Sequence, residues 1–305
     1  MAKLRFAALP LLMLISSCSF NRSFYPADKI PPTIKKLTIT TRYSNNAPPQ
    51  KTIVQIGPSF QPTFTDTQNN VLPLDYTVEG VVFKNSLGKN ISGWFIKSRN
   101  KPAADITLLF LHGNGGNIVS QYPAAARLAE QGFQVFMIDY SGYGFSEGKP
   151  TRMHVLDDAS SALDYLRARA DVQHTKLLIY GQSLGGHLAI VTAQRNESKI
   201  DGVVEEGGFS SHKDIAAHMF KPLAPVARVI VKGKYSAAKS VRKINKPVMV
   251  IHSSEDVVVP LWMGRKIYDR ANAPKTFYEI KHPHIAGPMY YADSIAYKIR
   301  EMVKG

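Results

Sequence analysis

Residues 175–196, TKLLIYGQSLGGHLAIVTAQRN, constrain the fold of this chain more than any other stretch. An apolar strand over 176–180 runs directly into the letters GQSLG at 181–185 and then into a helical pattern. A serine at such a junction sits on a sharp turn, where side chains two positions away on either side would crowd the backbone. Gly181 and Gly185 remove that crowding. Ser183 is therefore the first candidate for a nucleophile.

Strands and helices alternate along the chain from about residue 74. A hairpin is expected from strands at 78–83 and 91–96. Further strands are predicted at 106–111, 134–139, 203–206, 247–252 and 276–280, and helices at 118–131, 153–170, 261–271 and 288–303. This alternation predicts an α/β fold with about eight mostly parallel strands and helices on both faces. We expect one domain over 74–305, with a lid of short helices inserted at 209–245.

The N-terminus is typical of an export signal. Lys3 and Arg5 precede an apolar run at 6–15 that is too short to span a bilayer, which predicts a signal peptide over 1–17. The letters ISSC at 15–18 resemble the bacterial lipobox, in which Cys18 would become the lipid-bearing N-terminus. The alternatives are an ordinary signal peptide or an uncleaved anchor.

Lipidation would use the only cysteine of the chain. Several acyl chains on Cys18 would hold the protein at a membrane. The predicted location is the bacterial cell envelope, and Ser19 favours the outer membrane, facing the periplasm. Residues 18–73 are rich in Pro, Thr, Asn and Gln. They are predicted to be a lipid-attached tether and an N-terminal extension, whose order the composition leaves open.

A serine hydroxyl reacts when a base takes its proton, and that base is usually a histidine held by a carboxylate. Asp256 follows the predicted strand at 247–252, which places it on the same sheet edge as Ser183. It is the preferred acid. Glu205 and Glu206, at the end of the preceding strand, are the alternatives.

The base is expected in the loop KHPHIAG at 281–287. His284 is preferred over His282 because it lies deeper in the loop and nearer the last helix. The order Ser, Asp, His then matches the order that this kind of fold uses. Two such histidines could also bind zinc, but no third ligand is close by in sequence, so no metal is predicted.

The negative charge formed by attack on a carbonyl needs two donors in place beforehand. The N–H of Leu184, at the start of the helix, is one candidate. The other is the N–H of Asn114, in the glycine-rich loop HGNGGN at 112–117. That loop matches neither phosphate-binding glycine pattern.

Three stretches, LLFLHGNGGN, IDYSGYGFSEG and GQSLGG, together resemble the α/β-hydrolase superfamily. Within it they are similar to the branch of fungal Bem46-type proteins and animal depalmitoylating hydrolases. The resemblance covers about 74–303. It implies a triad of Ser183, Asp256 and His284, with an oxyanion hole at Asn114 and Leu184. The loop at 281–287 departs from the branch, which usually has Gly-x-Gly-His there.

These features predict a serine hydrolase that cleaves a small-molecule carboxylic ester or thioester through an acyl-Ser183 intermediate, without a cofactor. An amidase or peptidase would use the same groups. An envelope lipoprotein that kept the fold without turnover is the alternative from another class.

The formal net charge is +15. For an exported lipoprotein without a recognised binding module, this does not indicate nucleic acid. Anionic lipid headgroups are the preferred partner, and a solvated basic face is the alternative. The basic run lies in the predicted lid and contains Lys232, Lys234, Lys239, Arg242, Lys243 and Lys246. The oligomeric state is not indicated.

Overall fold

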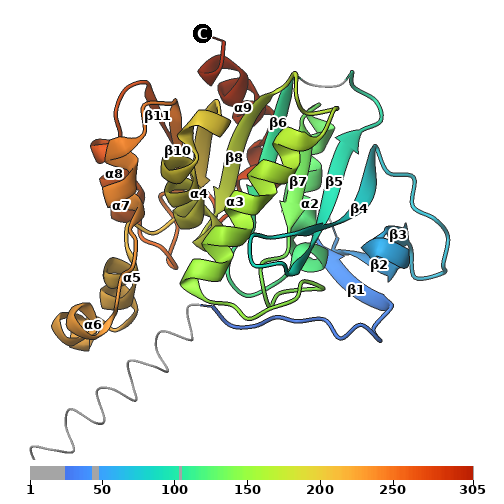
Figure 1. Cartoon of the computed structure of the whole chain (residues 1–305), viewed down its shortest axis with the longest axis horizontal. Helices are drawn as coiled ribbons and strands as arrows, with labels where there is room; N and C mark the ends of the chain where they lie inside the picture. Colours follow the sequence, from blue (N-terminus) through green and yellow to red (C-terminus); the bar gives the residue numbers. More distant parts are fainter. Residues whose placement is uncertain (1–24, 43–47, 103–104, 305) are drawn as a thin grey trace, which may run out of the picture.

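The computed structural model describes residues 25–42, 48–102 and 105–304. A central eight-stranded sheet has the order β11-β10-β9-β8-β6-β7-β5-β4 (Figure 1). Every neighbouring pair from β11 to β7 is parallel, and β5 and β4 continue the sheet antiparallel. The predicted α/β fold with a mostly parallel sheet is thus confirmed. The strands are β4 (Tyr76–Lys84), β5 (Asn90–Ser98), β6 (Ile106–Leu111), β7 (Gln134–Ile138), β8 (Lys176–Gln182), β9 (Gly202–Glu206), β10 (Val248–Ser253) and β11 (Lys275–Ile280).

Helices cover both faces of this sheet, so strands β6, β7 and β9 are buried along their whole length. Unbroken apolar runs such as ITLLFL in β6 are what a strand covered on both faces requires. One face packs against α2 (Ile118–Glu130) and α9 (Gly287–Met302). The other packs against α3 (Arg152–Ala168), α4 (Leu184–Arg195) and α8 (Leu261–Arg270).

Residues 209–245 leave the sheet after β9 and form short helices. These are α5 (His212–Met219), α6 (Ala224–Ile230) and α7 (Ala237–Ser240), with 3-10 turns at Lys221–Leu223 and Val241–Lys243. Pro222 and Pro225 lie in the first turns of their helices, where a missing N–H breaks no hydrogen bond. Helices α5 and α6 project beyond one end of the sheet, whereas α7 packs beside α4 and α8 (Figure 1).

The described part of the N-terminal extension, residues 25–42 and 48–73, contains a second, three-stranded sheet. Its antiparallel strands are β1 (Lys36–Thr41), β2 (Gln50–Ile56) and β3 (Pro62–Thr65). Val54 and Phe64 are buried in the core beside α2. The Phe64 ring lies 5.9 Å from that of Trp94 and 5.0 Å from that of Tyr122, centroid to centroid. This part of the extension is therefore packed structure and not a free tether.

A strap of residues 25–35 connects the lid side of the molecule to β1 (Figure 1). Its first residue, Tyr25, is buried, and its hydroxyl lies 3.0 Å from both His212 Nε2 and the Tyr235 hydroxyl. Further along, the Ile30 N–H donates to Gly144 O at 2.8 Å, and Ile30 is also buried. The strap is thus fixed at both the lid and the body.

Residues 1–17 and Cys18 lie outside the described residues, so the signal peptide and the lipidation site stay predictions. Among the described residues, no helix is both long and apolar enough to cross a bilayer.

Candidate active site

Ser183 occupies the turn between β8 and α4 with φ 55° and ψ −114°. A residue with a side chain rarely adopts this conformation, and holding it there costs about 1–3 kcal/mol. The flanking glycines explain how the turn closes. A Cβ on Gly181 would lie 2.1 Å from Gly185 O, and one on Gly185 would lie 1.9 Å from Leu111 O. Both contacts are with backbone, so neither position accepts a side chain.

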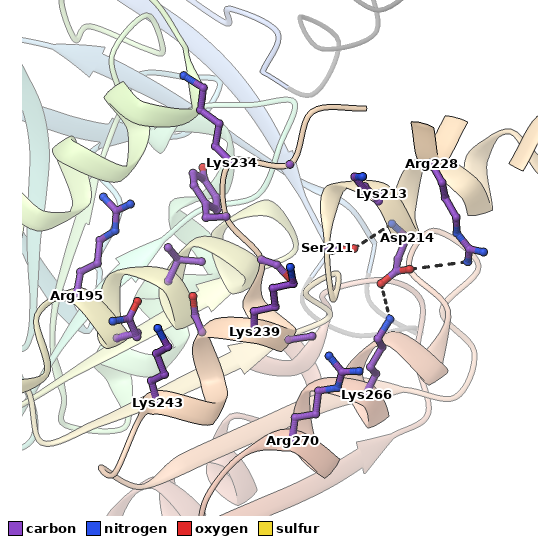
Figure 2. A pocket seen from close by; sticks show the side chains of 17 residues that line it. Arg195, Ser211, Lys213, Asp214, Arg228, Lys234, Lys239, Lys243, Lys266 and Arg270 are labelled. Carbon is purple, nitrogen blue, oxygen red and sulfur yellow. Dashed lines mark hydrogen bonds and ion pairs between the residues drawn. The ribbon is translucent and has the colours of Figure 1, made fainter. Parts of the chain in front are cut away.

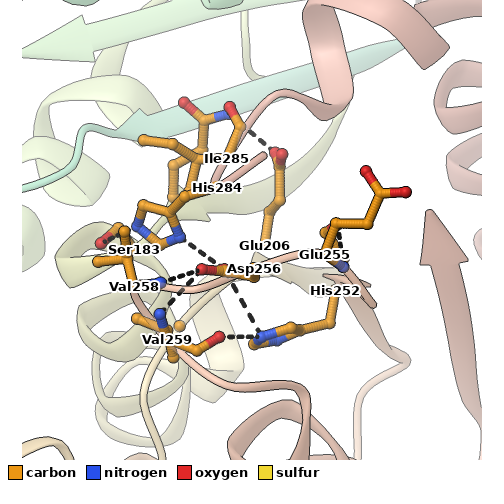
Figure 3. A network of polar contacts seen from close by, with 12 residues as sticks. Ser183, Glu206, His252, Glu255, Asp256, Val258, Val259, His284 and Ile285 are labelled. Carbon is orange, nitrogen blue, oxygen red and sulfur yellow. Dashed lines mark hydrogen bonds and ion pairs between the residues drawn. The ribbon is translucent and has the colours of Figure 1, made fainter. Parts of the chain in front are cut away.

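Three of the predicted site residues form one continuous series of hydrogen bonds (Figure 3). His284 Nε2 lies 2.8 Å from Ser183 Oγ, and His284 Nδ1 lies 2.6 Å from Asp256 Oδ2. An ionised carboxylate only accepts, so Nδ1 carries the proton and Nε2 is left free to accept one from the serine. This is the arrangement that activates a hydroxyl.

Asp256 is held as an ionised acceptor although it is buried. Burial raises the pKa of its carboxyl, but the His284 hydrogen bond and charge outweigh that effect, so the pKa lies below its ordinary value. The N–H groups of Val258 and Val259 add to the lowering by donating to Asp256 Oδ1 at 2.9 and 2.8 Å. The carboxylate thereby keeps one oxygen for the imidazole and one for the backbone.

The series does not include Glu255, the acidic neighbour of Asp256, or the alternatives Glu205 and His282. The Glu255 side chain points away from His284 (Figure 3). His282 stacks on Tyr290 with ring centroids 3.7 Å apart. Glu205 accepts from the Gly208 N–H at 2.7 Å, and burial raises its pKa to about 8, so it is largely protonated at neutral pH.

Glu206 has a role that the sequence did not suggest, because it fastens the loop that carries His284. Its Oε2 accepts from the Tyr180 hydroxyl at 2.6 Å and from Gln182 Nε2 at 2.8 Å, and its Oε1 accepts from the Gly287 N–H at 2.7 Å. Gln182 Nε2 also donates to Ile285 O at 3.1 Å. Ile285 has φ 52°, an unfavourable conformation for a β-branched residue, and these bonds hold it there.

The two residues expected to supply the oxyanion donors lie beside the serine. Asn114 and Leu184 line one pocket together with Ser183. Leu184 is the first residue of α4, so the helix itself does not use its N–H. Gln121 fixes the glycine loop from α2, because its Oε1 accepts from the Gly113 N–H at 3.0 Å and its Nε2 donates to Gly113 O at 3.3 Å.

That pocket has a volume of about 880 Å³ and is mostly apolar. The body supplies Val258, Val259 and Ile285, and the lid supplies Ile215 and other residues of 215–222. Met219 and Phe220 from the lid are 63% and 42% exposed, so the entrance is apolar as well. Among the described residues, no three His, Cys, Asp or Glu side chains converge to hold a metal ion.

The sheet, the strained serine turn and the hydrogen-bonded Ser183, His284 and Asp256 define the α/β-hydrolase class. The chain belongs to the alpha/beta hydrolase fold family, whose model matches residues 106–233.

Known proteins agree with this assignment. YfhR of Escherichia coli (strain K12) is 34% identical over 207 residues, covering 67% of this chain and 72% of YfhR. Protein bem46 of Schizosaccharomyces pombe is 31% identical over 172 residues, covering 56% of this chain and 58% of bem46, which confirms the resemblance to that branch. Esterase Pf2001 of Pyrococcus furiosus has the same fold, with a TM-score of 0.62, 18% identity, and coverage of 77% of this chain and 95% of the esterase.

Proposed function

We propose that this protein is a serine hydrolase that cleaves carboxylic esters or thioesters through an acyl-Ser183 intermediate. The observation that carries the proposal is the unbroken hydrogen-bond series from Asp256 through His284 to Ser183 Oγ, beside a large apolar pocket.

In the first half of the reaction, His284 Nε2 takes the hydroxyl proton as Ser183 Oγ attacks the carbonyl carbon. The resulting imidazolium is stabilised by the Asp256 carboxylate at Nδ1. The carbonyl oxygen becomes an oxyanion that the N–H groups of Leu184 and Asn114 would stabilise. When the tetrahedral intermediate collapses, the C–O or C–S bond breaks and His284 gives its proton to the leaving group.

In the second half, water replaces the leaving group. His284 takes a proton from the water as its oxygen attacks the acyl carbon, and the bond to Ser183 Oγ breaks as the histidine returns the proton to the serine. The acid product leaves and the enzyme is restored. No bound cofactor enters this sequence.

Because the pocket is lined mostly by apolar side chains, we infer that it binds an apolar acyl group of the substrate. Burying a methylene of such a chain is worth about 0.8 kcal/mol. Pf2001 and brefeldin A esterase, which share this fold, are both esterases, and this favours esters over amides as substrates of this chain.

The experiment is labelling with a fluorophosphonate probe, which reacts only with an activated serine. We expect labelling of the wild type and of Ser86→Ala, an exposed serine far from the site, and none of Ser183→Ala. Equal labelling of all three would refute the assignment. Turnover of p-nitrophenyl esters of increasing acyl length, beside an aminoacyl p-nitroanilide, then separates esterase from amidase activity.

We also propose that the mature protein is anchored in the bacterial envelope by lipid on Cys18. The support is the signal-like run at 6–15 and the letters ISSC at 15–18. Cells fed labelled palmitate should incorporate label into the wild type and not into Cys18→Ser. Label that persists in the variant would contradict the anchor.

A further inference from the structure

A second pocket, of about 480 Å³, lies beside the base of the lid and is strongly basic (Figure 2). Eight cationic side chains and one carboxylate line it. Lys213 and Arg228 reach it from the lid helices α5 and α6. Arg195 reaches it from the end of α4, and Lys266 and Arg270 reach it from α8. The lid and the body of the domain therefore both contribute positive charge to one space.

The chain itself does not neutralise this charge. Lys266 Nζ lies 2.7 Å from Asp214 Oδ2, and Arg228 lies 3.8 Å from Asp214 Oδ1. Within the described ranges, the other six cations form no ion pair at all. Like charges that converge on one concave space repel one another, and a bound polyanion removes that repulsion.

The pocket's chemistry favours phosphate. Lysine ammonium groups and arginine guanidinium groups only donate, and they are the side chains that bind phosphate oxygens most strongly. Ser211, Tyr235 and Ser236 supply neutral polar groups on the same walls. A compact group with more than one negative charge would meet cations from several directions in this space.

The pocket lies close to Tyr25, the first described residue after Cys18, and this closeness indicates the source of the phosphate. Tyr25 lies behind the pocket wall, with its hydroxyl 3.0 Å from that of Tyr235, which lines the pocket. Tyr25 lies only seven positions after Cys18, and a chain of that length spans at most about 25 Å even when fully extended. A lipid anchor on Cys18 would therefore keep this pocket close to the headgroups of the membrane that holds it.

We propose that this basic pocket binds the phosphate of an anionic lipid headgroup. The lipid source rests on the proposed anchor at Cys18, whereas the phosphate site rests only on the described side chains. The site is separate from the catalytic pocket but shares helix α5 with it, since Ile215 and His218 line one pocket and Lys213 and Asp214 line the other.

The six cations of the basic run in the lid fall into two groups, which allows a control variant to be chosen. Lys234, Lys239 and Lys243 line the pocket, whereas Lys232, Arg242 and Lys246 do not. A pocket triple, Lys239→Gln, Lys243→Gln and Arg270→Gln, removes three charges from the site. A control triple, Lys232→Gln, Arg242→Gln and Lys246→Gln, removes the same number from the surface nearby.

The experiment compares these two triples in the full chain carrying Cys18→Ser, so that no acyl anchor contributes. One arm measures binding of inorganic tripolyphosphate by calorimetry. The other measures sedimentation with vesicles of phosphatidylcholine, with and without phosphatidic acid. We expect the pocket triple to bind tripolyphosphate and the phosphatidic acid vesicles at least about tenfold more weakly than the control triple, with unchanged circular dichroism.

Two other results would overturn all or part of this proposal. Equal losses in both triples would overturn the site, because net charge alone would then explain the binding. Tripolyphosphate binding that depends on the pocket, with vesicle binding that does not, would keep the phosphate site and overturn the lipid as its source. Failure of the fluorophosphonate labelling described above would bear on the proposed catalysis and leave this result standing.

Discussion

Two pockets border helix α5, and they differ in whether their charged side chains are paired within the protein. In the catalytic pocket, the Asp256 carboxylate has an imidazole and two backbone N–H groups as partners. In the basic pocket, eight cations face a single carboxylate. A site that carries out chemistry on a neutral group has its charges balanced beforehand. A site with excess positive charge reaches electrostatic balance only when a ligand supplies the negative charge.

The largest expected effect tests whether the two pockets work independently. Asp256→Asn should lower kcat for a p-nitrophenyl ester by about 10³–10⁴-fold, because an amide no longer holds His284 in the productive tautomer. Binding of tripolyphosphate should not change. Glu255→Gln, one residue away and exposed, is the control and should stay within about twofold of wild type in steady-state assays. Activity above a tenth of wild type in Asp256→Asn would argue against the triad.

The next effect concerns how tightly the backbone is packed at the turn that carries Ser183. Gly185→Ala should lower the free energy of unfolding by about 3 kcal/mol, because the new methyl group would meet backbone at 1.9 Å. Gly186→Ala is the matched control. Its Cβ would meet its nearest neighbours at 3.1 Å, so a loss of about 1 kcal/mol is expected. Urea denaturation measures both, and equal losses would contradict the crowding argument.

Glu205, near the catalytic site, is an exception to the rule that acidic groups there are paired. It is a buried carboxyl whose Oε1 has no hydrogen-bond partner among the described residues. Burial raises its pKa to about 8, so the folded protein keeps a proton that the unfolded chain loses above about pH 4.5. The contribution of Glu205 to the free energy of unfolding of the wild type should therefore decrease as pH rises from about 4.5 to 8.

Glu205→Gln has no proton to lose, so its stability relative to wild type should grow across that range. We expect a gain of about 2 kcal/mol at pH 8, after allowing for the unpaired amide. Urea midpoints at several pH values measure the difference. A difference that does not change with pH would show that Glu205 is ionised in the folded protein.

The smallest effect concerns the basic pocket in the absence of ligand. Removing three of its charges in the pocket triple should raise the melting temperature by about 1–2 °C at low salt, because the remaining cations repel one another less. The gain should disappear in high salt. Thermal denaturation at two salt concentrations checks this, and a gain that survives high salt would mean that charge is not its cause.

The catalytic groups could be predicted from sequence because each follows a local pattern. Ser183 lies in a five-residue signature, and Asp256 and His284 follow strands whose ends meet at one edge of a parallel sheet. The role of Glu206 could not be predicted, since its partners Tyr180 and Gly287 come from distant parts of the chain.

Other features depend on contacts that only the folded chain makes. The basic pocket combines Arg195, Lys266 and Arg270 with a lid run that alone reads as a charged surface. The strands β1 to β3 are short and rich in threonine, and they gain stability by packing on the body and not from their own pattern.

The three-stranded sheet also decides where the chain can be cut. A fragment that began at residue 74, where the alternating pattern starts, would lack Phe64 and so uncover the rings of Trp94 and Tyr122. Such a bare aromatic patch promotes aggregation of expressed fragments. A shortened gene made for crystallisation should therefore begin no later than Tyr25, whose hydroxyl also contacts His212 and Tyr235.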